Sequence, residues 1–215
     1  MTYLLDTMIV SYFLQAQRET ELATAAKRCS IALVEEVRRE LENDKTRGGR
    51  FFKKWFDASG IKPLAIELGT PAHATLAALV SPISTGKNLG ERASIAVAAS
   101  EATLTFVTND KNGLCVALRE IWMPGERVLG LAVFLRRLFE EHALEDPNAL
   151  DDVMAVALTS PQQQPTWWAS FRARLASASA PITAQSGATA AQDANRGSVR
   201  TPSASRSDGE PGATT

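Results

Sequence analysis

Short runs of consecutive hydrophobic residues alternate along the chain with segments in which hydrophobic residues recur at helical spacing. The runs at residues 3–5, 30–32, 103–107 and 121–123 predict buried strands, and 103–107 is the clearest because it combines β-branched and aromatic side chains. The periodic segments predict helices over residues 7–15, 19–28, 33–43, 71–80, 91–102 and 131–142. Strands that alternate with helices favour an α/β fold around a parallel sheet.

The sequence changes character after residue 143. Residues 144–178 predict two further helices, the second of which carries Trp167 and Trp168, and we interpret them as a C-terminal helical appendage. Residues 179–215 consist mainly of Ala, Ser, Thr, Gly and Pro. Such a segment buries too little apolar surface to offset the entropy of ordering it, so we expect a disordered tail. The active domain is therefore expected within residues 1–143.

The composition excludes several classes of protein. The chain has 23 basic and 24 acidic residues and a formal net charge of −1, which excludes a globally basic nucleic-acid-binding protein but not a local basic surface. No apolar run is long enough for a transmembrane helix, and the first residues do not resemble a signal peptide. Cys29 and Cys115 match no metal-binding or redox spacing, so we interpret them as structural thiols. These features predict a cytoplasmic protein with no membrane partner.

A local basic segment lies at residues 45–54, where Lys and Arg residues are interleaved with Phe51 and Phe52. Together with Trp55 and Phe56, the two phenylalanines form one face of a short amphipathic helix that ends at Gly60. We expect this helix to bury its aromatic face and to expose its basic residues.

Two aspartates follow predicted strands. Asp6 comes directly after residues 3–5, and Asp110 follows residues 103–107 by way of Thr108 and Asn109. The carboxyl ends of parallel strands border the ligand crevice of an α/β sheet, so both carboxylates are expected to point into it. Each aspartate taken alone is better explained as the N-cap of the helix that follows it.

Two glutamates on predicted helices complete a set of four acids. Glu36 and Glu40 flank the apolar stripe of the helix at residues 33–43, one turn apart, and Glu91 begins the helix at residues 91–102. A solvated helix edge explains Glu36, and the helix dipole explains an acid in a first turn, so neither residue is specific by itself. Asp6, Glu36, Glu91 and Asp110 together would form a cluster of oxygen ligands, which suits Mg²⁺ or Mn²⁺.

The segments that carry these acids resemble a known family in their order and in the elements around them. They read YLLDTMIVSYFL, SIALVEEVRREL, LGERASIAVAAS and LTFVTNDKNG. This order is similar to that of PIN-domain ribonucleases, and the resemblance runs from Tyr3 to about His142. It implies a PIN-like three-layer α/β/α sandwich with a short parallel central sheet in residues 1–143. The C-terminal helices at 144–178 and the tail at 179–215 lie outside it.

The resemblance also implies an activity, a site and partners. By similarity, Asp6, Glu36, Glu91 and Asp110 are the catalytic, metal-binding acids of a Mg²⁺- or Mn²⁺-dependent endoribonuclease that hydrolyses RNA. Five further residues are expected around them, in contact with phosphate or with the acids: Thr7, Arg92, Thr108, Asn109 and Lys111. RNA is the implied substrate, the toxin of a toxin–antitoxin pair is the implied role, and an antitoxin protein and a second copy of the chain are candidate partners.

Two departures from the family pattern leave an alternative open. Ala93 and Asn112 stand where members often carry further acids, so the site is expected to hold one metal, or a second only with substrate. A catalytically weak or inactive PIN-like module that binds RNA or a protein partner is the alternative. A haloacid-dehalogenase-like phosphatase also begins with a strand and an aspartate, but it needs Asp-x-Asp, and this chain has Asp6-Thr7-Met8.

Overall fold

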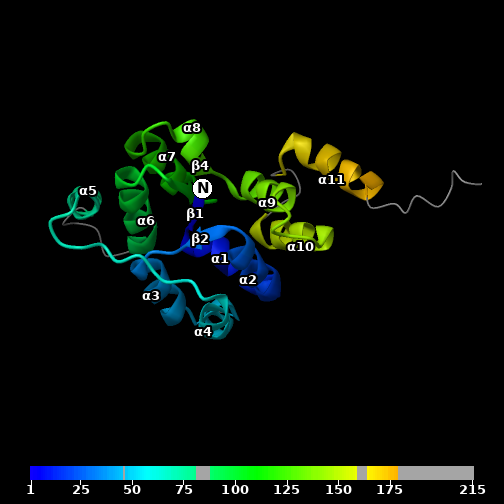
Figure 1. Ribbon diagram of the computed structural model, residues 1–215, viewed down its shortest axis with the longest axis horizontal. Coiled ribbons are helices and arrows are strands. Elements are labelled where there is room, and N and C mark those ends of the chain that lie inside the picture. The colour runs from blue at the N-terminus through cyan, green and yellow to red at the C-terminus, as the bar shows by residue number, and fades with distance from the viewer. Residues whose placement is uncertain (46, 81–87, 159–163, 179–215) are drawn as a thin grey trace, which may run out of the picture. The chain divides into compact units, whose positions relative to one another are not determined.

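The computed structural model describes residues 1–45, 47–80, 88–158 and 164–178 (Figure 1). The disordered tail predicted at residues 179–215 lies outside the described residues. Residues 1–175 form one compact unit, which includes the described residues from 144 to 175. No helix in the described part of the chain is long and apolar enough to span a membrane.

A four-stranded parallel sheet lies at the centre of this unit. Its strands are β1 (Thr2–Leu5), β2 (Ser30–Ala32), β3 (Leu104–Val107) and β4 (Val128–Leu129), arranged in the order β2-β1-β3-β4. All three pairs are parallel, and Leu5 pairs with Val107 at the carboxyl ends of the two central strands. The α/β fold with a parallel sheet predicted from the sequence is therefore confirmed.

The strand predicted at residues 121–123 is wrong, because the fourth strand lies at Val128–Leu129 instead. Ile121 is buried, but the side chains of Trp122 and Met123 are 73% and 43% exposed, and Met123 adopts a positive φ of 52°. These residues form a surface bend before Pro124. A short apolar run does not distinguish a buried strand from an exposed turn, which explains the error.

Helices cover both sides of the sheet, an arrangement compatible with three layers. Figure 1 shows α5, α6 and α7 on one side of the strands and α9 and α10 on the other. The helices of the described residues are α1 (Thr7–Gln15), α2 (Glu19–Arg28), α3 (Glu35–Asn43), α4 (Arg47–Ser59), α5 (Pro71–Leu79), α6 (Leu89–Ser100), α7 (Lys111–Glu120), α8 (Pro124–Arg127), α9 (Leu131–Glu140), α10 (Pro147–Ala157) and α11 (Thr166–Ala178).

The sheet is buried on both faces, which is why its strands are continuous apolar runs rather than alternating ones. Leu4, Leu5, Phe106 and Val107 are fully buried. On α4, Phe52 and Trp55 are buried, so the predicted packing of the aromatic face is confirmed for these two residues. Cys115, by contrast, lies exposed at the surface.

Candidate functional site

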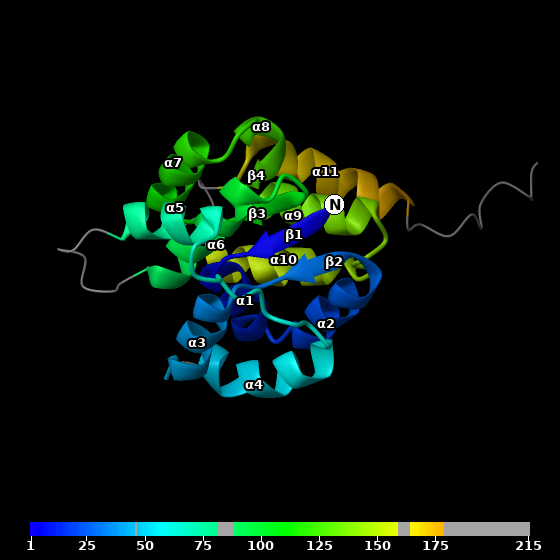
Figure 2. The ribbon, with the colours of Figure 1, turned by 60° about the vertical axis from the view of Figure 1, so that its left-hand side comes forward.

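The carboxyl edge of the sheet brings the two predicted aspartates together. Figure 2 shows β1 running from the N-terminus toward α1 and α6. Asp6 directly follows β1, and its backbone N–H donates to the carbonyl of Val107 at the end of the neighbouring strand β3, at 3.0 Å. Asp110 follows β3 three residues later. The parallel pairing of β1 and β3 therefore brings two acids that are remote in sequence to the same edge.

Both aspartates are also helix N-caps, so the structural explanation of each is correct as well. Asp6 Oδ1 accepts a hydrogen bond of 2.7 Å from the backbone N–H of Thr7 at the start of α1. Asp110 Oδ1 accepts from the backbone N–H groups of Asn112 and Gly113, at 2.7 and 2.9 Å, at the start of α7. Capping through Oδ1 fixes the orientation of each carboxylate.

Thr108 connects the two aspartates. It is 1% exposed, and its hydroxyl donates to Asp6 Oδ2 at 2.9 Å while accepting from the backbone N–H of Asp110 at 3.1 Å. The sequence suggested that Thr108 contacts phosphate or the acids, and the structure places it against the acids.

Glu40 is a member of this cluster that the sequence-based prediction omitted. Its Oε2 accepts a hydrogen bond of 2.6 Å from the Thr7 hydroxyl, and its Oε1 accepts one of 2.8 Å from the backbone N–H of Gly90. Gly90 leaves the space for this contact, because a Cβ there would lie 2.7 Å from Glu40 Oε2. Thr7 thus orients Glu40 with its side chain and Asp6 with its backbone.

Glu36 lies one turn before Glu40 on α3, and so on the same face of that helix. It is partly exposed, and its Oε2 is buried without a hydrogen-bond partner among the described residues. The neighbouring Glu35 differs from it, because it forms ion pairs with Arg38 and Arg39 at 2.6 and 3.2 Å. Of the α3 acids, Glu40 makes the contacts to Thr7 and Gly90, and Glu36 carries an unpaired carboxylate oxygen one turn away.

Glu91 is 8% exposed in the first turn of α6 and lies against the backbone of Gly113 on α7. Burial raises its pKa to about 7, and the negative charges of Asp6 and Asp110 contribute to the rise, whereas Arg92 lowers it. Its position over the apolar face of α6 was the feature in the sequence that distinguished it from a solvated acid.

Asp6 shows the same perturbation. Burial raises its pKa to about 6, although the hydrogen bonds from Thr108 and Thr7 lower it, and the charges of Glu40 and Asp110 raise it further. Asp6, Glu40, Glu91 and Asp110 therefore act electrostatically on one another. We call these four residues the acid cluster.

The acid cluster has the right chemistry for a hard divalent cation. Its donors are all carboxylate oxygens, which Mg²⁺ and Mn²⁺ prefer, and a cation would relieve the mutual repulsion. However, the described residues contain no group of three or more His, Cys, Asp or Glu side chains already arranged to hold a metal ion. Several carboxylate oxygens are engaged by Thr7, Thr108 and Gly90. Binding would therefore require the side chains to draw closer together.

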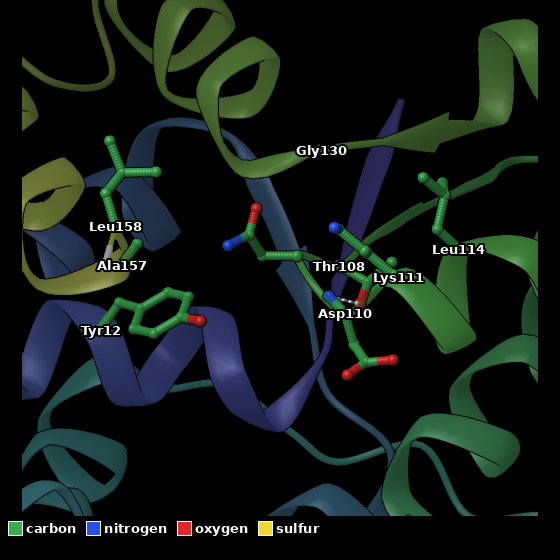
Figure 3. Close-up of a pocket in the computed structure, with 9 residues that line it drawn as sticks. Tyr12, Thr108, Asp110, Lys111, Leu114, Gly130, Ala157 and Leu158 are labelled. Atoms are coloured by element: carbon green, nitrogen blue, oxygen red, sulfur yellow. Dashed lines mark hydrogen bonds between the residues drawn. The ribbon is translucent and has the colours of Figure 1, made fainter. Parts of the chain in front are cut away.

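The remaining predicted site residues differ in their surroundings. The Arg92 guanidinium donates to the carbonyl of Leu79 at 2.6 Å, so it is held by the protein. Asn109 and Lys111 are exposed and line a cavity of about 550 Å³ together with Asp110 (Figure 3). Of the two basic residues predicted at the site, Lys111 is therefore the one that a phosphate of the substrate can reach.

The two departures from the family pattern are also visible in the structure. Ala93 is fully buried in the hydrophobic core, so that position of α6 contributes to packing rather than to ligation. Asn112 is exposed in the first turn of α7, and its backbone N–H donates to Asp110, the N-cap of that helix. The acids present are therefore those of the acid cluster and Glu36.

No similar protein was found. The chain matches no model of a known protein family, no curated protein and no solved structure. The resemblance to PIN-domain ribonucleases therefore stays a prediction from the sequence motifs.

Proposed function

We propose that this chain is a Mg²⁺- or Mn²⁺-dependent nuclease that hydrolyses phosphodiester bonds of RNA, with a PIN-like fold. The acid cluster carries this proposal. Four carboxylates from separate elements meet at the carboxyl edge of a parallel sheet, and the pKa values of Asp6 and Glu91 are raised to about 6 and 7. Strongly perturbed acids that meet at such an edge are typical of functional sites.

The residues around the cluster support phosphodiester chemistry. The carboxylates of the acid cluster would hold a divalent cation, which would supply an activated water and neutralise charge on the phosphoryl oxygens. Asp6 and Asp110 are the fixed members, because helix capping and Thr108 hold them. Lys111 stands beside Asp110 at the cavity and can bind a phosphate of the substrate.

The proposal is tested with the purified full-length chain on a pool of RNAs in the presence of Mg²⁺ or Mn²⁺. Asp6→Asn and Asp110→Asn are expected to abolish cleavage and to weaken Mn²⁺ binding measured by titration calorimetry. Asp57→Asn is the matched control, because Asp57 is exposed on α4 and lies outside the acid cluster. Equal cleavage by the wild type and Asp6→Asn, or no cleavage by either with both metals, contradicts the proposal.

The toxin role is part of the same proposal. An RNase of this kind is expected to arrest growth when it is expressed in bacteria, and Asp6→Asn is expected to relieve the arrest. An antitoxin would then bind the wild-type chain and prevent cleavage. Undiminished toxicity of Asp6→Asn contradicts this role.

A second candidate is a catalytically weak or inactive module that binds RNA or a protein partner. The absence of a preformed metal-ligand group among the described residues favours it, as does the buried Ala93. Under this reading the chain binds RNA without cleaving it, and Asp6→Asn binds RNA with unchanged affinity. Metal-dependent cleavage that Asp6→Asn removes excludes this candidate.

A further inference from the structure

A cavity of about 550 Å³ lies directly beside the acid cluster, between α1, the turn after β3 and the C-terminal end of α10. This volume is within the range of small-molecule binding sites in proteins. Asp110 lines the cavity and is also a member of the acid cluster, so a group bound in the cavity is adjacent to the proposed reaction site.

Most of the cavity wall is apolar and one side of it is aromatic. Leu114, Ala157 and Leu158 supply the apolar wall, and Tyr12 projects from α1 with its ring along the cavity. Figure 3 shows the Tyr12 hydroxyl on the side of the ring toward Asp110. Within the described part of the chain this hydroxyl has no hydrogen-bond partner. A flat ring, apolar side chains and an unpaired hydroxyl suit a planar aromatic ligand with a polar edge.

Polar groups stand at the same cavity. Asn109 is exposed and presents an amide, which both donates and accepts hydrogen bonds, and Lys111 presents an ammonium group. A nucleobase has a polar edge that an amide can read, and it is linked to a phosphate that an ammonium group attracts.

We propose that this cavity binds the base of the nucleotide next to the scissile phosphodiester, in single-stranded RNA. The inference rests on the proposed function, because that function places the phosphodiester at Asp110. A base inside a duplex is paired and stacked, whereas an unpaired base can swing out and stack on an aromatic side chain. The substrate is therefore a single strand or a loop.

A second, smaller cavity continues from the first. It has a volume of about 210 Å³, shares Asn109, Gly130 and Leu158 with the first, and reaches Trp167 on α11. The Arg136 guanidinium lies 5.8 Å from the centroid of the Trp167 ring. An indole flanked by a cation can receive a second base, with the charge facing its phosphate. The bound RNA strand thus runs from the acid cluster past Tyr12 toward Trp167.

The test compares ligands with and without a base. Titration calorimetry in Mg²⁺ buffer measures the binding of the four nucleoside 5′-monophosphates and of ribose 5-phosphate. At least one monophosphate is expected to bind roughly 5- to 150-fold more tightly than ribose 5-phosphate, the range that stacking of one base provides. Because both ligands carry the same phosphate, the ratio isolates the contribution of the base.

Variants then locate the binding of the base. Ala157→Trp fills the cavity and is expected to reduce the ratio to about one, whereas Ala155→Trp, on the exposed side of the same helix, is expected to leave it unchanged. If Ala157→Trp fails to fold by circular dichroism, Tyr12→Leu serves instead, because it removes the aromatic ring.

Three outcomes overturn the inference: equal binding of the monophosphates and ribose 5-phosphate, a ratio that survives Ala157→Trp or Tyr12→Leu, or a ratio that Ala155→Trp reduces equally. None of these depends on hydrolysis. A chain that shows base-dependent binding in this cavity but cleaves no RNA therefore contradicts the proposed function alone, and a chain that cleaves RNA without such binding contradicts the inference alone.

Discussion

Glu91 occupies space that only a glycine at position 113 leaves open. A Cβ on Gly113 would lie 2.1 Å from Glu91 Oε2 and 2.5 Å from its carboxyl carbon. Gly113 also donates its backbone N–H to Asp110 Oδ1. The first turn of α7 therefore positions two members of the acid cluster at once, one through a hydrogen bond and the other through the absence of a side chain.

The substitution Gly113→Ala is expected to displace the Glu91 carboxylate while retaining the hydrogen bond to Asp110. The displaced group is the end of a flexible side chain, so the free energy of unfolding should change by no more than about 1 kcal/mol. Mn²⁺ affinity and RNA cleavage should fall at least tenfold, since one ligand moves out of place. Gly125→Ala is the matched control, because a Cβ there meets no atom within 4 Å. Unchanged Mn²⁺ affinity in Gly113→Ala would remove Glu91 from the site.

Glu40 and Glu36 give a second prediction, since Glu40 accepts hydrogen bonds from Thr7 and Gly90, whereas Glu36 Oε2 has no partner among the described residues. Glu40→Gln is expected to reduce cleavage and Mn²⁺ affinity about as strongly as Asp6→Asn does. Glu36→Gln is the paired variant on the same helix face, and it is expected to have the smaller effect. Cleavage rates and calorimetry on both variants decide between them. The opposite ranking would restore Glu36 as the ligand suggested by the sequence.

The difference between Glu36 and Glu40 shows what the sequence could predict of the site. Helical periodicity placed both residues on one edge of α3, but the choice between them depends on which of the two reaches Thr7 and Gly90 when α3 packs. Those two residues lie 33 and 50 positions away from Glu40 in sequence. Contacts over such separations follow from tertiary packing, which periodicity does not encode. Asp6 and Asp110 were easier, because each ends a strand and begins a helix.

The fold was also predictable only where a local sequence pattern identifies a strand or a helix. Residues 103–107 identified β3 because a β-branched and aromatic run is buried on both faces of the sheet. Residues 121–123 are equally apolar, yet Trp122 and Met123 lie at the surface. The true fourth strand has two residues, Val128 and Leu129, and so is too short to leave a pattern. Its place is set by pairing with Phe106 and Val107.

Thr108 supports a third prediction, because its hydroxyl is the buried connection between Asp6 and Asp110. Thr108→Val keeps the shape of the side chain but leaves Asp6 Oδ2 and the Asp110 N–H without this partner. The free energy of unfolding in urea should decrease by roughly 1 to 3 kcal/mol. The pKa of Asp6 should rise further, since the hydrogen bond from Thr108 is the interaction that lowers this pKa most. A carboxyl titration by NMR that finds the pKa of Asp6 unchanged contradicts this role.

The raised pKa values of Asp6 and Glu91 predict how stability depends on pH and metal. Both groups bind protons more tightly in the folded chain, with pKa values of about 6 and 7, than at their ordinary values of 3.8 and 4.5. In the metal-free protein their contribution to stability is therefore present at low pH and is lost as pH rises through 6 and 7. Their ionisation should lower the free energy of unfolding by roughly 2 to 4 kcal/mol between about pH 5 and pH 8.

Mg²⁺ competes with these protons, so it should raise the melting temperature more at pH 8 than at pH 5. Thermal unfolding followed by circular dichroism measures both effects, and the double variant Asp6→Asn/Glu91→Gln should show a flatter pH dependence and a much smaller response to Mg²⁺. If Mg²⁺ stabilises the wild-type chain equally at both pH values, metal binding is not linked to the protonation of Asp6 and Glu91.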